Sequence, residues 1–391
     1  MNNSRLPCVQ HDCCNSGAHE FHIKNRIWIG DGMKRIASAI SLMCISLSSH
    51  AQGSVTLFGM VDEGITYVTN VHGGHQVAVQ DSIQFPSVFG FLGKEDLGGG
   101  TSAIFQMISQ FSVSTGALIA PNTLFNRTAL VGLNNVDYGK LTFGNQYSVM
   151  MDSLVFGGYD AAFTYGGLFN LRQGPFAKLG ITNNPTGSFE FDQLGAGGIP
   201  NSVKYVSPIF HGVSAAAQYS FGGVAGDFSA NRAMSFALNL QTGGFSAALA
   251  YLDRRYPSMN NGLDGIRNYG AGLKYFFADT TASVLFTDTQ NTLTGAKIWV
   301  VQAGLQRWFG TAWLAGINYQ YMKGNAELSH NKANQVTAGV QYWLSKRTDV
   351  YVTAVFQQAG GDEGANAWIN GLSQSSSSRQ TALRIGLATS F

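Results

Sequence analysis

The sequence lacks a long apolar run over most of its length. After Ala51, no stretch of 18 apolar residues occurs in this chain of 391 residues, so this region has no segment that could cross a membrane as a helix. Charged residues are also scarce, at 12% of the chain, against roughly 25% in soluble domains. A membrane protein without a spanning helix is left with the closed β-barrel, because an open sheet edge has no hydrogen-bond partner in lipid.

Cysteine is absent after Ala51, and no second pair of ligands follows the early cysteines at zinc spacing. The region after Ala51 therefore has neither a disulfide nor a cysteine zinc site. The four cysteines of the chain are Cys8, Cys13, Cys14 and Cys44.

Neither sign of charge dominates. The 24 Lys and Arg include five before Gln52, and the 22 Asp and Glu include three, so the region from Gln52 onward carries 19 of each. This balance does not resemble the basic surface of a nucleic-acid-binding protein. We therefore expect no nucleic-acid partner.

Catalytic motifs are missing as well. The glycines of residues 97–100 are not followed by the Lys-Ser/Thr pair that completes a phosphate loop. His72 and His75 flank two glycines with no acid between them, which is typical of a surface loop, and His330 has Glu327 as its neighbouring acid. We expect no enzyme activity, no metal and no cofactor.

The N-terminal region is typical of a targeting segment. A positive start at residues 33–35, an apolar stretch at residues 36–47 and the small-x-small site at residues 49–51 predict a signal peptide over residues 33–51. Residues 1–32 form an extension without an interpretable pattern, as an over-long start assignment would produce. Cleavage after Ala51 leaves residues 52–391 as the mature domain.

From Gln52 onward, apolar and polar residues alternate in about sixteen short segments, as Tyr219 and Phe221 do with Gln218 and Ser220. A strand that crosses a membrane needs roughly ten tilted residues, with every second side chain facing lipid. The connectors are short and long in turn, which predicts an antiparallel transmembrane β-barrel. A soluble β-sandwich has the same period of two, but the signal peptide and the regular alternation of connectors favour the barrel.

The longest irregular stretch covers about residues 151–200. Structureless loops beyond about 15 residues are usually functional or disordered. This one is rich in aromatic residues, which favours packing against another surface. In a barrel, the surface available to it is the inner wall.

Short motifs then occur in a fixed order: residues 54–59 (SVTLFG), 93–100 (GKEDLGGG), 126–133 (NRTALVGL), 201–205 (NSVKY) and a terminal Phe391. Together they resemble the general diffusion porins of Gram-negative bacteria, and most of all their β-proteobacterial branch. The resemblance covers residues 52–391.

The resemblance implies an all-β, sixteen-stranded antiparallel transmembrane β-barrel in the outer membrane of a Gram-negative bacterium. It implies a homotrimer surrounded by outer-membrane lipid, with the third long loop, about residues 151–200, folded into the lumen. The implied function is a passive, water-filled channel for small hydrophilic solutes and ions.

In that family, arginines on the wall face acidic groups on the loop. Arg127 and Lys204 match basic positions here, whereas Val88 and Asn145 stand where arginines are common. On the loop, Val155 replaces the acid of the family's Glu-Phe-Gly-Gly motif, next to Phe156. Further charged candidates on the loop are Asp152, Asp160, Arg172 and Lys178. We expect a weaker transverse field and lower charge selectivity than in the family as a whole.

Two rival functions stay open. Phe156, Tyr159 and Phe163 could form an apolar track for a sugar or an aromatic acid, which would make the channel selective for a substrate. An outer-membrane enzyme or adhesin would need a catalytic group at the rim or a large external loop, and the sequence contains neither.

Overall fold

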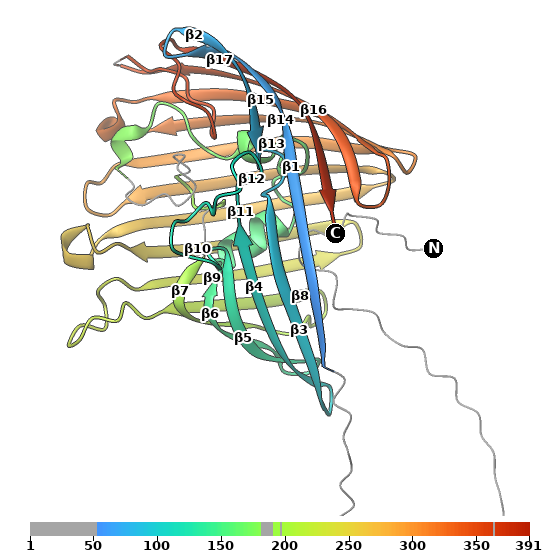
Figure 1. Cartoon of the computed structure of the whole chain (residues 1–391). Helices are drawn as coiled ribbons and strands as arrows, with labels where there is room; N and C mark the ends of the chain where they lie inside the picture. The colour runs from blue at the N-terminus through green and yellow to red at the C-terminus, as the bar shows by residue number, and fades with distance from the viewer. Residues whose placement is uncertain (1–52, 181–190, 196–197, 363) are drawn as a thin grey trace, which may run out of the picture. The chain divides into compact units, whose positions relative to one another are not determined.

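The computed structural model describes residues 53–180, 191–195, 198–362 and 364–391, so the predicted extension 1–32 and signal peptide 33–51 lie outside the described residues. Within these ranges, the strands belong to one antiparallel sheet (Figure 1). The strands are β1 Ser54–Val71, β2 Gly74–Asp81, β3 Val88–Gly98, β4 Thr101–Gln110, β5 Thr128–Asn135, β6 Gly139–Gln146, β7 Ile199–Val206, β8 Val213–Ser220, β9 Ala233–Thr242, β10 Phe245–Arg255, β11 Gly265–Phe277, β12 Thr280–Asn291, β13 Lys297–Phe309, β14 Trp313–Gly324, β15 Lys332–Trp343, β16 Thr348–Gly360 and β17 Arg379–Ser390.

The sheet closes because β1 pairs with β17 on one side and with both β2 and β3 on the other. β2 lies against the second half of β1 and β3 against its first half, so β2 and β3 together occupy the position of one interrupted strand. The barrel is therefore sixteen-stranded, as predicted. The predicted histidine loop is instead a tight turn, with positive φ at His72 and Gly73, that leads directly into β2.

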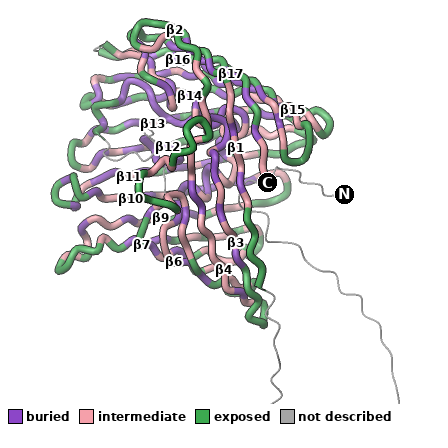
Figure 2. Tube along the Cα trace, viewed as in Figure 1, coloured by how far each residue is buried: buried purple, intermediate pink, exposed green. Residues whose placement is uncertain are grey.

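The two faces of the sheet follow the period of two. On β13, Val301 and Leu305 are exposed on the outer face, whereas Gln302 and Gln306 are buried on the inner face. Figure 2 shows the same alternation of buried and more exposed residues along the neighbouring strands. An apolar outer face suits lipid, and a polar inner face suits a water-filled lumen.

The connections differ between the two ends of the barrel. Turns of a few residues join β3 to β4, β9 to β10, β11 to β12 and the later pairs at one end, whereas longer loops occupy the other end. In outer-membrane barrels the short turns face the periplasm, so the long loops mark the external end.

Short helical segments occur mainly in the connection from β6 to β7. They are α1 Val149–Met151, η1 Asp152–Phe156, α2 Phe163–Gly166, η2 Gly167–Asn170 and η3 Ala177–Leu179, with η4 Asn260–Gly262 and η5 Ala326–Leu328 in external loops. No helix in the described part of the chain is long and apolar enough to cross a membrane.

A buried ion pair crosses the seam at which the barrel closes. Arg384 on β17 lies 3.5 Å from the Asp62 carboxylate on β1, and both side chains are inaccessible to solvent. Tyr351 on β16 donates a hydrogen bond to Asp62 and accepts one from Arg384. The backbone N–H of Gln84, in the segment between β2 and β3, also donates to Asp62 at 2.7 Å. Removing one partner of such a pair costs about 3–5 kcal/mol, because the remaining charge stays buried.

Candidate functional site

The described part of the connection from β6 to β7, residues 147–180, 191–195 and 198, lies inside the barrel, and we call this connection the inner loop. Its first turn is capped by the Ser148 side chain, which accepts a hydrogen bond from the Met151 N–H at 3.0 Å. The Met150 N–H donates to the Ser235 hydroxyl of the wall at 3.1 Å, and Leu154 packs with wall residues in a fully buried cluster. Buried aliphatic side chains therefore hold the start of the inner loop against β8–β12.

Glycines on the inner face of the wall make room for the inner loop. A Cβ added to Gly270 would overlap Leu154, one on Gly272 would overlap the ring of Tyr159, and one on Gly316 would overlap the ring of Tyr165. We call the glycines that meet the inner loop in this way the glycine track; they are Gly270, Gly272, Gly304, Gly316 and Gly339. The loop lies close to the wall because these positions carry no side chain.

The first charged pair of the site joins the wall to the loop. Lys204 shares the inner face of β7 with Ser202, and its ammonium lies 2.7 Å from the Asp152 carboxylate. It also donates to the carbonyl of Tyr147 at 2.9 Å. Because the Lys204 side chain is 8% exposed and that of Asp152 22%, the pair has limited access to the lumen.

The second charged group lies deeper. The Arg172 guanidinium is 2.7 Å from Asp160 and 3.1 Å from Asp192, and all three side chains are inaccessible to solvent. Gln302 on β13 donates to Asp160 at 2.6 Å and accepts from Arg172, so the group attaches the loop to the wall. Thr287 on β12 donates to Asp192 at 3.1 Å.

The remaining wall positions predicted from the sequence lie away from these groups. Arg127 is half-buried and donates to the Gln110 side chain at 2.8 Å. Asn145 stands beside a break in the β6–β7 register and donates to the carbonyl of Asn126 at 3.3 Å. Val88 is buried at the start of β3, opposite Gln110 of β4.

The predicted loop positions divide between buried and accessible. Val155 is buried in the cluster that packs against the wall, whereas Phe156 is partly exposed and lies edge-on to Tyr147 at 5.5 Å between ring centroids. Lys178 donates to the Ser329 hydroxyl of an external loop at 2.9 Å.

The three aromatic residues of the predicted apolar track do not share one surface. Tyr159 is 4% exposed and packs against Gly272, whereas Phe156 and Phe163 are partly exposed. Lys274 of the wall covers the Tyr159 ring at 5.3 Å and donates to the carbonyl of Gly157 at 2.6 Å. A solute in the lumen therefore meets at most two of the three rings.

Sequence reasoning missed the glycine track, the seam pair and the role of Gln302. One signal was available, because Gly270 and Gly272 occupy successive inner-face positions of β11. The described residues contain no group of three or more His, Cys, Asp or Glu side chains that could hold a metal ion.

Comparisons with known proteins give a consistent result. A family model described as Gram-negative porin matches residues 37–362. The chain is 27% identical to outer membrane porin protein 32 of Delftia acidovorans, over 92% of this chain and 100% of that protein. It is also 27% identical to the major outer membrane protein P.IB of Neisseria meningitidis serogroup B, over 83% of this chain and 94% of that protein.

Two solved structures have a similar fold. The anion-selective porin from Comamonas acidovorans matches with a TM-score of 0.71 and 22% identity, over 87% of this chain and 100% of that one. The in-vitro folded OmpT of Vibrio cholerae in its trimer form matches with a TM-score of 0.62 and 12% identity, over 87% of this chain and 99% of that one. At these identities the likeness concerns the fold alone.

Proposed function

Because this chain belongs to the Gram-negative porin family and forms a diffusion channel in the outer membrane, we propose that the channel passes small hydrophilic solutes and ions with little preference for either charge. The observation that carries this proposal is the pairing of the charges inside the barrel. Lys204 lies against Asp152, and Arg172 lies between Asp160 and Asp192.

A paired charge acts weakly on a passing ion, because the fields of two opposite charges a few ångströms apart largely cancel at the distance of the ion. The seam pair of Asp62 and Arg384 is neutral in the same sense and has no access to solvent. The inner face therefore carries fewer effective charges than its sequence suggests.

Of the inner-face cations named above, two form no ion pair within the described residues. They are Arg127, which bonds to Gln110, and Lys274, which bonds to Gly157. Two unit charges at roughly 10 Å, screened by 0.1 M salt, favour anions over cations by about threefold. The proposed channel thus has a weak anion preference, whereas the porin from Comamonas acidovorans is described as anion-selective.

We further propose that the channel is a homotrimer. The support is the family resemblance and the trimer form of the OmpT structure with a similar fold. Native mass spectrometry of detergent-purified protein should give a mass three times that of the mature chain, and a monomer mass would contradict the assembly without affecting the channel.

The ion preference is tested by the zero-current potential of single channels in a planar bilayer under a salt gradient. We expect a permeability ratio of about threefold in favour of anions. A ratio above tenfold in either direction would falsify the pairing argument. Saturable block of the current by one sugar or aromatic acid would instead favour the substrate-selective channel.

A further inference from the structure

Two lysines face each other across neighbouring strands on the outer surface of the barrel. Lys323 of β14 and Lys332 of β15 are direct partners in the antiparallel register, and both are exposed. Like charges directly opposite each other destabilise a sheet unless another group neutralises them. Within the described part of the chain, no carboxylate forms an ion pair with either lysine.

This lysine pair is the top of a ladder of outward-facing partners on β14 and β15. Below it, Tyr321 is paired with Asn334, Tyr319 with Val336, and Ile317 with Ala338. The ladder therefore changes from basic to aromatic to apolar as it descends from the external end. This sequence of side chains matches a membrane leaflet, in which charged headgroups lie above an interface favoured by Tyr and Trp and above the acyl chains.

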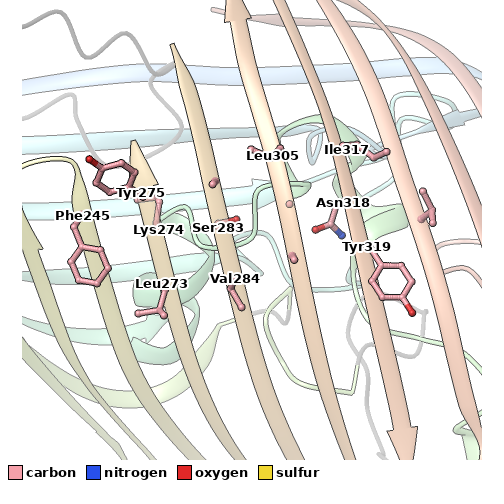
Figure 3. Close-up of a pocket in the computed structure, with 14 residues that line it drawn as sticks. Phe245, Leu273, Lys274, Tyr275, Ser283, Val284, Leu305, Ile317, Asn318 and Tyr319 are labelled. Atoms are coloured by element: carbon pink, nitrogen blue, oxygen red, sulfur yellow. The ribbon is translucent and has the colours of Figure 1, made fainter. Parts of the chain in front are cut away.

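An apolar groove occupies the lower part of the ladder. It has a volume of about 590 Å³ and is lined on the outer face by Leu273, Val284, Leu305, Ile317 and Val336, with Tyr319 toward the lysine pair. Figure 3 shows Leu273, Val284 and Leu305 on adjacent strands, with Ile317 and Tyr319 along β14. Above the groove, Trp299 and Tyr321 pack edge-to-face at 5.3 Å between centroids.

The outer face carries other basic residues at both ends of the barrel. At the external end, Lys297 lies 3.1 Å from Asp288, whereas Arg267, Arg255 and Arg232 share the single carboxylate of Asp253 at 3.4 to 3.9 Å. At the periplasmic end of β13, Arg307 is exposed on the outer face and lies over the Phe309 ring at 5.4 Å. The lysine pair therefore combines two uncompensated cations with an apolar groove beneath them.

We propose that the outer face of β14 and β15 binds a phosphorylated lipid of the outer leaflet, with its phosphate between Lys323 and Lys332 and its acyl chains along the groove. A phosphate is the anion that two ammonium groups on directly paired residues can share. The groove supplies the contact that a free anion would not use. This inference depends on the outer-membrane location and is independent of the ion preference proposed above.

The test measures lipid A binding to the detergent-refolded barrel by native mass spectrometry. One lysine near an anionic headgroup layer contributes about 1 kcal/mol, which is about fivefold in affinity. Lys323→Gln combined with Lys332→Gln should therefore weaken binding by about 25-fold. The charge-preserving Lys323→Arg with Lys332→Arg should retain it, and the matched control Arg307→Gln should bind as the wild type does.

Two further arms identify the source of the phosphate. Lipid A stripped of its phosphates should bind the wild type as weakly as intact lipid A binds the glutamine variant. Inorganic phosphate at the same concentration should not displace lipid A, because it does not fill the groove. Displacement by inorganic phosphate, or equal binding by the wild type and the glutamine variant, would overturn the proposal.

The conductance of the glutamine variant provides the final check. Both lysines lie in the outward phase of their strands, so the single-channel conductance should equal that of the wild type. A changed conductance would show that the side chains face the lumen, and the proposal would fall.

Discussion

Two buried arginines hold this barrel together, and they join different pairs of elements. Arg384 joins the last strand to the first through Asp62 at the seam. Arg172 pairs with Asp160 within the inner loop, and both side chains bond to Gln302 of the wall. Both guanidiniums are inaccessible to solvent. An ion pair across the seam therefore secures closure of the sheet, whereas an ion pair within the loop, hydrogen-bonded to Gln302, secures the position of the loop. Substitutions should separate the two.

Replacement of Arg384 has the largest expected effect. Arg384→Gln leaves the Asp62 carboxylate buried without its cation, so the free energy of unfolding should fall by about 3–5 kcal/mol. Urea titration of the detergent-refolded barrel, followed by tryptophan fluorescence, measures this change. The control Arg379→Gln, exposed on the same strand, should stay within about 0.5 kcal/mol of the wild type. Equal losses in the two variants would show that the seam pair does not stabilise the closed sheet.

Replacement of Arg172 should affect the loop more than the barrel. Arg172→Gln should destabilise the contact between the inner loop and the wall by about 3 kcal/mol. This change raises the population of barrels with a detached loop roughly a hundredfold. We expect faster protease cleavage within the loop and noisier single-channel currents, while the urea midpoint of the barrel falls less than in the Arg384 variant. If the loop stays protected while the whole barrel loses stability, the two arginines have the same role and the comparison fails.

A substitution in the glycine track sharpens the comparison without removing a charge. Gly316→Leu forces the Tyr165 ring from its place, and overpacking of this kind costs about 1–3 kcal/mol. The displaced loop should alter the single-channel conductance, and adding Tyr165→Ala should bring the conductance back toward the wild-type value. Gly53→Leu is the control, because a Cβ there meets no atom within 4 Å. If the double variant is no closer to the wild type than Gly316→Leu alone, the glycine does not position the loop.

The smallest expected effect concerns the pair of Lys204 and Asp152, which has limited access to the lumen. Asp152→Asn uncovers the lysine and should shift the permeability ratio toward anions by about twofold, whereas Lys204→Gln should shift it toward cations by a similar factor. The double variant should return to the wild-type ratio. Zero-current potentials under a salt gradient measure all three, and shifts of the same sign in both single variants would rule out pairing as the cause.

The periodicity of the sequence predicted most of the barrel. The alternation of Tyr219 and Phe221 with Gln218 and Ser220 corresponds to the end of β8, and the predicted short connectors include the turn at Gly243 and Gly244 between β9 and β10. These features are local, because a period of two and a glycine turn depend on neighbours in the sequence. The interruption between β2 and β3 was not predicted, because it depends on Asp62, which accepts hydrogen bonds from the backbone of Gln84 and Phe85.

The candidate site was less accessible to sequence reasoning, because its contacts join distant segments. The resemblance predicted Lys204 as a basic position of the wall, but nothing in the sequence paired it with Asp152. Gly316 and Tyr165 likewise become partners through the fold of the loop. The roles predicted for Val88, Asn145 and Val155 in ion selection stay predictions, since selectivity depends on the field of all the charges together.

The seam also bears on the kinetics of assembly. β1 pairs with β17, the last strand in the described residues, so the ring cannot close until that strand has reached the membrane. Until then the hydrogen-bonding groups along that edge of β1 have no partner, and such an exposed edge is prone to pair with other chains. The open edge of β1 therefore has to be shielded from other chains until the sheet closes. The contact between Asp62 and Arg384 can form only when β1 and β17 pair.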